Sequence, residues 1–259
     1  MTYANTALIT GASSGIGLEL ARLHAQQGGD LVLVARSENK LNALKKELEQ
    51  THGVNACVIT ADLTDPTSAQ AIYNETKRQD IEIDILINNA GFGGHGFFHE
   101  RDLQADLDMI QVNISSLTAL THLFVQDMTA RKHGKILNVS STVSLLPGPL
   151  QATYYATKAF VTSFSQALAE ELGDHGISVT ALCPGPVATE FAKTGNLEEL
   201  AVFKQGKSPQ SVAKCGYQAM QKGKLLAFND PMLNFMLNWI VPLLPRRLVL
   251  ALSRRTMEK

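Results

Sequence analysis

The stretch ALITGASSGIGLELARLHAQQG (residues 7–28) places Gly11, Gly15 and Gly17 between a short apolar run and a longer segment with helical periodicity. This pattern predicts a buried strand, a turn and a helix. Glycines in such a turn permit positive φ and let a bulky group approach without meeting a Cβ. A helix N-terminus offers free N–H groups and partial positive charge, so the expected guest is an anion such as a dinucleotide pyrophosphate. The alternative is a tight turn that only packs the helix on the strand.

Length and composition favour one α/β domain. The chain has 259 residues, of which 45% are hydrophobic and 18% charged, near the upper size for one hydrophobic core. A net charge of −1 and a pI near 6.7 give no electrostatic footprint for nucleic acid, so we expect no such partner. Cys57, Cys183 and Cys215 are widely spread and unpaired in sequence, which is typical of reduced thiols. The N-terminus lacks signal-peptide character, so a cytoplasmic protein is expected.

Apolar runs alternate with helical patterns along most of the chain, which predicts βαβ units and a parallel sheet buried on both faces. No linker divides the chain before about residue 185. We therefore expect a single domain over residues 1–259, with a dinucleotide-binding and catalytic core (1–184), a helical substrate flap (185–215) and an apolar C-terminal tail (231–259). The later strands are expected at residues 31–35, 56–61, 83–89, 135–141, 177–183 and 224–228.

Ligands of such sheets bind at the carboxyl ends of the strands. The second strand ends at Arg36, where selection of NAD would place an acidic residue on the ribose 2′-OH. A guanidinium instead suits a 2′-phosphate, so NADPH is expected to be preferred over NADH. After the third strand, Asp62 and Leu63 lie at the same edge. Asp62 either caps the following helix or accepts a hydrogen bond from an adenine amino group.

A tyrosine and a lysine four residues apart lie where a helix should begin, just past the fifth strand. Tyr154 and Lys158 therefore share one helix face. A neighbouring ammonium favours the phenolate, so we expect the tyrosine pKa to be lowered. Tyr155 competes for the same role on chemistry alone. The four-residue spacing to Lys158 selects Tyr154.

Together these motifs resemble the short-chain dehydrogenase/reductase family, conventional branch. The resemblance covers roughly residues 5–190 through TGASSGIG (10–17), NNAG (88–91), Asn113, Ser141, YYATK (154–158) and PGPVAT (184–189). It implies a Rossmann fold, a doubly wound parallel sheet of order 3-2-1-4-5-6-7, and a nicotinamide dinucleotide. The expected cofactor-binding residues are Gly11, Ser13, Ser14, Gly15, Ile16, Gly17, Arg36, Asp62, Leu63, Asn89, Ala90, Gly91, Tyr154, Lys158, Pro184, Gly185, Val187 and Thr189.

The resemblance also implies catalytic roles. Tyr154 is the general acid for carbonyl reduction, and Ser141 donates a hydrogen bond to the substrate oxygen. Lys158 holds the nicotinamide ribose and lowers the tyrosine pKa. Asn113 binds the water that links Lys158 to solvent, or alternatively is a polar residue that bends the helix over residues 102–132. Thr189 meets the nicotinamide carboxamide.

An uncharged lining favours an apolar ketone or aldehyde as substrate. The expected lining residues are Phe92, Phe97, Leu145, Leu146, Pro147, Phe191 and Phe203. The sequence is most similar to bacterial members of the family without assigned substrates, with a fainter likeness to hydroxysteroid dehydrogenases and long-chain 3-ketoacyl reductases, which is analogy only. A second hypothesis is an NADPH-binding sensor or scaffold without turnover. His95 and His99 have metal-ligand spacing but no third ligand nearby, so we interpret them as loop histidines and expect no metal.

Two regions suggest further contacts. The helices over residues 102–132 and 151–173 carry apolar residues round much of their circumference, which with the resemblance predicts a homodimer or homotetramer. The tail over residues 231–259 is apolar but interrupted by Asn234, Asn238 and Pro242, too broken to cross a hydrocarbon core needing about 20 residues. Its apolar residues are expected to wall the pocket or a subunit contact, or to touch a membrane peripherally.

Overall fold

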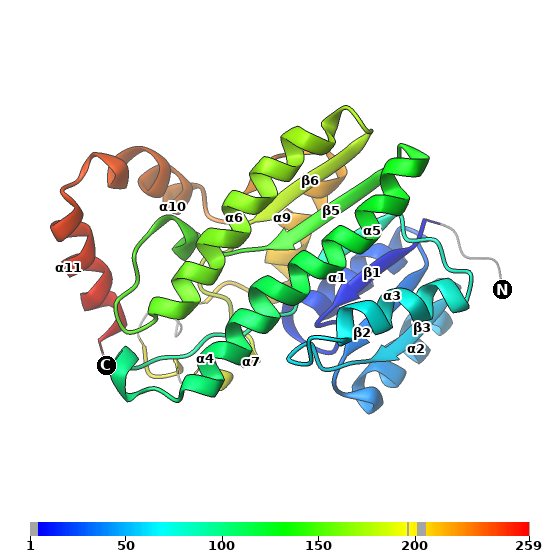
Figure 1. The fold of residues 1–259 in the computed structure, drawn as a ribbon, viewed down its shortest axis with the longest axis horizontal. Coiled ribbons are helices and arrows are strands. Elements are labelled where there is room, and N and C mark those ends of the chain that lie inside the picture. The colour runs from blue at the N-terminus through cyan, green and yellow to red at the C-terminus, as the bar shows by residue number, and fades with distance from the viewer. Residues whose placement is uncertain (1–4, 196, 201–205, 259) are drawn as a thin grey trace.

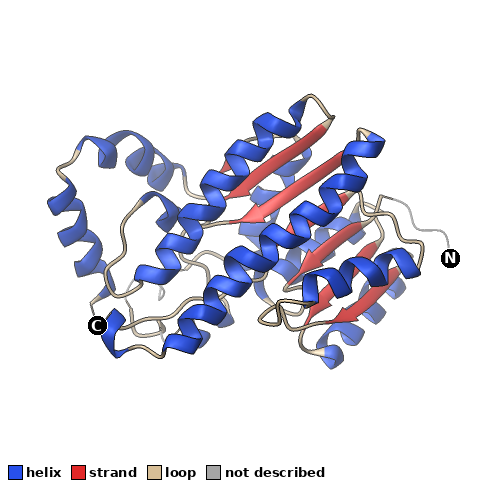
Figure 2. Cartoon of the chain, viewed as in Figure 1, coloured by secondary structure: helices blue, strands red, loops and turns tan. Residues whose placement is uncertain are grey.

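The computed structural model describes residues 5–195, 197–200 and 206–258. A seven-stranded sheet lies between two layers of helices (Figures 1 and 2). Its order is β3-β2-β1-β4-β5-β6-β7 and every neighbouring pair is parallel, which confirms the predicted fold. The strands are β1 (Ala7–Thr10), β2 (Leu31–Ala35), β3 (Ala56–Thr60), β4 (Ile85–Asn88), β5 (Gly134–Val139), β6 (Ile177–Leu182) and β7 (Leu226–Ala227), the last shorter than the expected 224–228.

Helices cover both faces of this sheet, because its strands are apolar on both. On one face α1 (Gly15–Gln26), α2 (Glu38–His52) and α9 (Pro209–Gln221) pack into one hydrophobic core. On the other face α3 (Ser68–Arg78) and α5 (Leu117–Arg131) pack into a second core, which α6 (Ala152–Gly173) closes at its C-terminal end. The sheet therefore separates two cores, and its carboxyl edge remains available for a site.

The spacing of the glycines follows from how closely α1 approaches the neighbouring strands. Gly11 has a φ of +66°, which a side chain would disfavour. A Cβ on Gly17 would lie 2.4 Å from both the Gly11 carbonyl oxygen and the Asn89 Nδ2. The same Asn89 amide donates to the Thr10 carbonyl at 2.9 Å. Gly17 thus serves helix packing, while the residues between the outer glycines face the carboxyl edge of the sheet.

The helix expected over residues 102–132 is continuous but bent. Asp102 caps α4 (Leu103–Ile110) by accepting from the Ala105 N–H at 2.7 Å. A π-helical turn over Gln111–Ser116 then joins α4 to α5. Such bulges in helices are frequent at functional sites, and this one contains Asn113.

Beyond the sheet, two segments lie at its carboxyl edge. The region expected to form the flap contains the short helix α7 (Glu190–Thr194), and part of it lies outside the described residues. The final segment, which we call the C-terminal arm, spans residues 231–257 and contains α10 (Pro231–Phe235), a π-helical turn over Met236–Ile240 and α11 (Arg246–Met257). Figure 1 shows this arm, in orange and red, beside α6 and away from the strands. Among the described helices, none has the length and apolar character to cross a membrane.

The close packing at Gly17 predicts a stability loss on adding one methyl group. Because the new Cβ would meet backbone, Gly17→Ala should lower the free energy of unfolding by about 1–3 kcal/mol. The matched control is Gly173→Ala at the end of α6, where a Cβ meets nothing within 4 Å and a small gain is expected. Chemical denaturation measures both variants. Equal stabilities would contradict the packing role of Gly17.

Candidate active site

A cavity of about 570 Å³ opens along the carboxyl ends of the strands and continues to the C-terminal arm. Of the residues expected to bind the cofactor, all except Gly17 line it, since Gly17 lies behind the turn. Ser141, Tyr154 and Lys158 line it as well. Lys40, Gln151, Glu190 and Thr256 also line it, although the sequence analysis did not place them in the site.

The turn after β1 fits an anionic group. Ser14 is the N-cap residue of α1 in extended conformation, and its side chain makes no capping hydrogen bond. The first N–H groups of a helix have no partner within the helix, and the helix dipole favours negative charge there. Ser13, Ser14 and Ile16 line the cavity beside these groups. The cradle therefore fits the pyrophosphate of a dinucleotide.

Positive charge gathers where β2 ends. Arg36 is exposed and lines the cavity, and Lys40 lines it from the first turn of α2. The sequence analysis missed Lys40, although its spacing of four residues from Arg36 is the signal that places both at one helix end. Lys40 also forms an exposed ion pair across the cavity mouth, with its Nζ 3.5 Å from Glu190 Oε1 on α7. The two cations suit a phosphate at the end of β2.

Asp62 lines the same part of the cavity but does not cap α3. Its Oδ1 accepts from the N–H and the hydroxyl of Thr64, both at 3.0 Å, in a local turn. Helix α3 begins only at Ser68, six residues later. The capping alternative is therefore wrong, and the carboxylate remains at the cavity wall.

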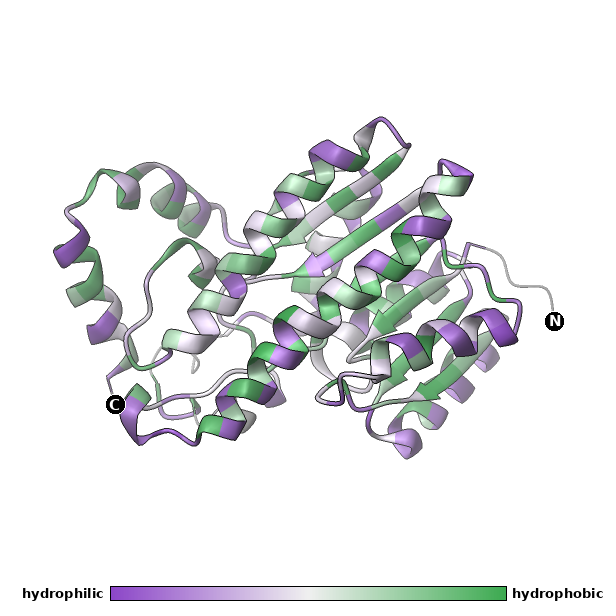
Figure 3. Ribbon diagram, viewed as in Figure 1, coloured by the Kyte–Doolittle hydropathy of each residue, from purple (hydrophilic) through white to green (hydrophobic). Residues whose placement is uncertain are grey.

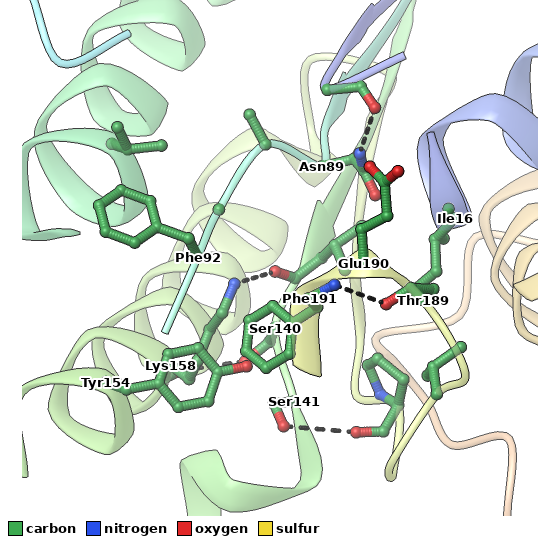
Figure 4. A pocket seen from close by; sticks show the side chains of 18 of the residues that line it. Ile16, Asn89, Phe92, Ser140, Ser141, Tyr154, Lys158, Thr189, Glu190 and Phe191 are labelled. Carbon is green, nitrogen blue, oxygen red and sulfur yellow. Dashed lines mark hydrogen bonds between the residues drawn. The ribbon is translucent and has the colours of Figure 1, made fainter. Parts of the chain in front are cut away.

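Tyr154, Ser141 and Lys158 meet at the junction of β5 and α6 (Figure 4). Lys158 Nζ donates to the Val139 carbonyl oxygen at 2.8 Å and lies 5.9 Å from the centre of the Tyr154 ring. The Ser141 hydroxyl donates to the Pro184 carbonyl oxygen at 3.4 Å and lies close enough to the Tyr154 phenol to favour the phenolate. The Phe191 ring lies 5.3 Å from the Tyr154 ring, measured between centres. Tyr154 thus lies where polar strand ends meet an apolar wall.

Burial dominates the electrostatics of this group. Loss of solvent raises the pKa of Tyr154 well above its usual value, and the nearby Ser141 hydroxyl only partly opposes this. The expectation that the pKa of Tyr154 is lowered is therefore wrong for the chain without a bound cofactor. Burial also lowers the pKa of Lys158 to about 8. The phenol is consequently held protonated beside an amine whose pKa is lowered by the same burial.

Asn113 does not line the cavity, because its side chain forms hydrogen bonds behind the cavity wall. Its Nδ2 donates to the Phe92 carbonyl and to the Thr157 hydroxyl, both at 3.0 Å, and its Oδ1 accepts from the Phe92 N–H at 3.2 Å. A Cβ on Gly91 would lie between Asn113 and Lys158. Asn113 therefore joins the bent helix to the strand end beside Lys158, which is compatible with either expected role.

The residues that line the apolar half of the cavity agree only in part with those expected from the sequence. Phe92, Leu146 and Phe191 line it, but Leu145 does not. Residues three apart share a face in a 3₁₀ turn, so Val143 and Leu146 face the cavity and Leu145 turns away. Of the other expected residues, Phe97 is exposed and Pro147 is absent from the wall, while Phe203 lies outside the described residues.

The C-terminal arm supplies part of the cavity wall, which is one of the alternatives expected for the apolar tail. Leu233 and Leu237 line the cavity from the start of the arm, and Thr256 and Met257 line it from the end. His95 Nε2 lies 2.7 Å from the Met257 carbonyl oxygen and so anchors α11. Within the described part of the chain, no three metal-binding side chains cluster.

Comparison with known proteins identifies the family. The model of the short chain dehydrogenase family matches residues 5–200. Mouse 17-beta-hydroxysteroid dehydrogenase type 3 is 37% identical over 72% of this chain and 61% of its own length. Very-long-chain 3-oxoacyl-CoA reductase of Anas platyrhynchos is 31% identical over 96% of this chain and 79% of its own length.

Among solved structures, a short-chain dehydrogenase from Sphingobium yanoikuyae in complex with NADPH superposes with a TM-score of 0.85. It is 32% identical and covers 92% of this chain and 93% of its own. The chain thus spans about three fifths of the mouse relative but nearly all of this bacterial structure. On its fold, its motifs and these matches, the chain belongs to the short-chain dehydrogenase/reductase family.

Proposed function

We propose that this chain is an NADPH-dependent oxidoreductase that interconverts an apolar ketone or aldehyde and its alcohol, with Tyr154 as the general acid or base. The observation that carries the proposal is the position of Tyr154. Its ring is buried, Ser141 lies beside it in the same cavity, and it lies where the dinucleotide cradle meets the apolar half of that cavity. A binding module without turnover has no need of this arrangement.

The residues around Tyr154 have separable tasks. A bound nicotinamide dinucleotide supplies the hydride. The Ser141 hydroxyl donates a hydrogen bond to the carbonyl oxygen as negative charge grows there, and the Tyr154 hydroxyl gives that oxygen its proton. The remaining phenolate is stabilised by the Lys158 ammonium. Asn113, which lies beside Lys158, orients the polar path through which Tyr154 regains its proton.

The cofactor preference rests on the end of β2. Arg36 and Lys40 line the cavity there, and the sequence from Ala35 to Ser37 contains no acidic residue. Two cations attract a 2′-phosphate, whereas the ribose 2′-OH of NADH is bound through a hydrogen bond to an acidic side chain. The bacterial structural relative binds NADPH, which agrees with this assignment.

The substrate class rests on the opposite wall. Phe92, Leu146, Phe191, Leu233 and Leu237 line it and none is charged. An apolar carbonyl compound loses little on leaving water for such a wall, while a charged one would lose its hydration. The names of the two curated relatives refer to steroid and very-long-chain acyl substrates, which are lipophilic in the same sense.

We also propose a homo-oligomer assembled through α4 and α6. Several apolar residues of α4, α5 and α6 are buried within the chain, including Met109, Leu117 and Val161. The exposed ones are Leu103, Leu107 and Ile110 on α4 and Phe160 on α6, two helices in contact with each other. Covering this face with a second copy removes it from water.

Removing the phenol hydroxyl tests the acid assignment. Tyr154→Phe should lower the rate of NADPH oxidation with a hydrophobic ketone by about 10²–10⁴-fold and leave NADPH affinity nearly unchanged, because only proton donation is lost. Single-turnover fluorescence of NADPH measures both quantities. Tyr155→Phe is the matched control and should keep most of the rate. The reverse result would move the role to Tyr155, and a wild-type chain that binds NADPH but oxidises it with no ketone would support the sensor hypothesis.

Charge reversal at the end of β2 tests the cofactor preference. Arg36→Asp should weaken NADPH binding by about tenfold or more relative to NADH, because a charge-assisted contact becomes a repulsion. Lys46→Asp, an equal charge change on the exposed side of α2, is the control. Titration of cofactor fluorescence measures the affinities. Equal affinity of the wild-type chain for the two cofactors would refute the preference.

A charge in the α4/α6 face tests the assembly. The double variant Leu107→Glu/Phe160→Glu should be a monomer, because two carboxylates would be buried against like charges in a two-fold contact. Leu225→Glu, at an exposed leucine before β7, should leave the assembly intact. Light scattering at micromolar concentration measures the mass. A wild-type monomer would refute the oligomer.

A further inference from the structure

The C-terminal arm presents an apolar stripe to solvent. Its exposed side chains recur every three or four residues, as on one side of a helix, at Met232, Phe235, Met236, Trp239, Ile240 and Leu243. Trp239 is 70% exposed and Leu243 is 82% exposed. Large side chains of this kind rarely gather on the surface of a soluble chain without a contact to make. The stripe therefore marks an interaction surface.

The same arm also forms part of the cavity. Leu233 and Leu237, interleaved in sequence with the stripe, face inward and line the substrate half of the cavity. The polar residues Asn234 and Asn238 hydrogen-bond to each other on the remaining side, 2.8 Å apart. One short segment thus separates the cavity from the exposed stripe. Whatever covers the stripe lies one helix away from the substrate half of the cavity.

Positive charge accompanies the stripe. Arg246, Arg247 and Arg255 are exposed along α11, as is Arg254, which pairs with Glu258 at 2.8 Å, and residues 231–257 contain no acidic residue. Three exposed leucines, Leu248, Leu250 and Leu252, lie between the two arginine pairs. Figure 3 shows the apolar segments of the arm in green, with purple at the start of α11 and again near its end. The surface combines apolar area, one tryptophan and cations.

We propose that the arm docks on an anionic lipid surface, so that a lipophilic substrate enters the cavity from the bilayer. The inference rests on the proposed function for its substrate and on the arm itself for the docking. Tryptophan prefers the headgroup region, apolar side chains enter the outer acyl layer, and arginines pair with anionic headgroups. A second copy fits less well, because a two-fold contact between arms would set arginines against arginines.

Docking is measured directly through the tryptophan, because Trp239 is the only one in the chain. Anionic vesicles of phosphatidylcholine and phosphatidylglycerol should shift its emission to the blue and carry the protein upward in flotation. Vesicles of phosphatidylcholine alone should do so much less. Raising the salt concentration should weaken the binding, because the arginine contribution is screened.

Variants separate the two parts of the surface. Leu243→Glu should weaken binding to anionic vesicles by about tenfold or more, because a buried apolar side chain becomes a charge. Arg246→Gln/Arg247→Gln should weaken it by about fivefold for each arginine. Leu225→Glu, at the amino edge of the sheet, is the control and should bind as the wild type does. Leu243 and both arginines lie outside the cavity lining, so the rate with a water-soluble ketone should stay unchanged.

A separate measurement tests whether the substrate enters from the bilayer. With a long-chain ketone dissolved in anionic vesicles, Leu243→Glu should lose about as much rate as it loses vesicle affinity. Unchanged Trp239 emission and no flotation of the wild type would overturn the docking. A wild-type assembly in solution that Leu243→Glu dissociates would overturn it too, by assigning the stripe to a second copy. Vesicle binding without turnover of any ketone would leave the docking standing and refute the proposed function.

Discussion

The close approach of helix α1 to the end of strand β4 is the constraint on which the site depends. Gly17 brings the helix against the Gly11 carbonyl, and the Asn89 amide ties that turn to the next strand. With the helix held there, its free N-terminal N–H groups open onto the carboxyl edge of the sheet. Strand β5 ends at the same edge, and the segment that follows it places Ser141 beside Tyr154. One backbone contact thus places the anion cradle and the reacting groups along the same edge of the sheet.

The sequence predicts well those features that depend on the local order of residues along the chain. Buried parallel strands are apolar on both faces, so their runs stand out, and the residues just past them must share one edge. That reasoning brings Arg36, Asn89, Ser141 and Tyr154 into one cavity, as the structure has them. The helix spacing likewise places Lys158 beside Tyr154. The family resemblance adds the strand order, which composition and periodicity leave open.

What the sequence does not predict depends on contacts between distant segments. Burial of Tyr154 comes from packing against Phe191 on α7, so the direction of its pKa shift is invisible in the local spacing. Leu145 was expected at the cavity wall, but the 3₁₀ turn rotates it away from Leu146. The share of the cavity wall supplied by Met257 requires α11 to fold back and meet His95, a contact across 162 positions of sequence.

The two walls of the cavity come from different parts of the chain. The wall with Tyr154 is built into the sheet and the helices that flank it, whereas Leu233 and Met257 belong to an arm that follows the last strand. Substitutions in the arm therefore alter which molecules fit while the reacting groups keep their support. Such a division lets related chains diverge in what they accept without rebuilding how they react. It also makes the arm the natural segment to exchange when a new specificity is sought in the laboratory.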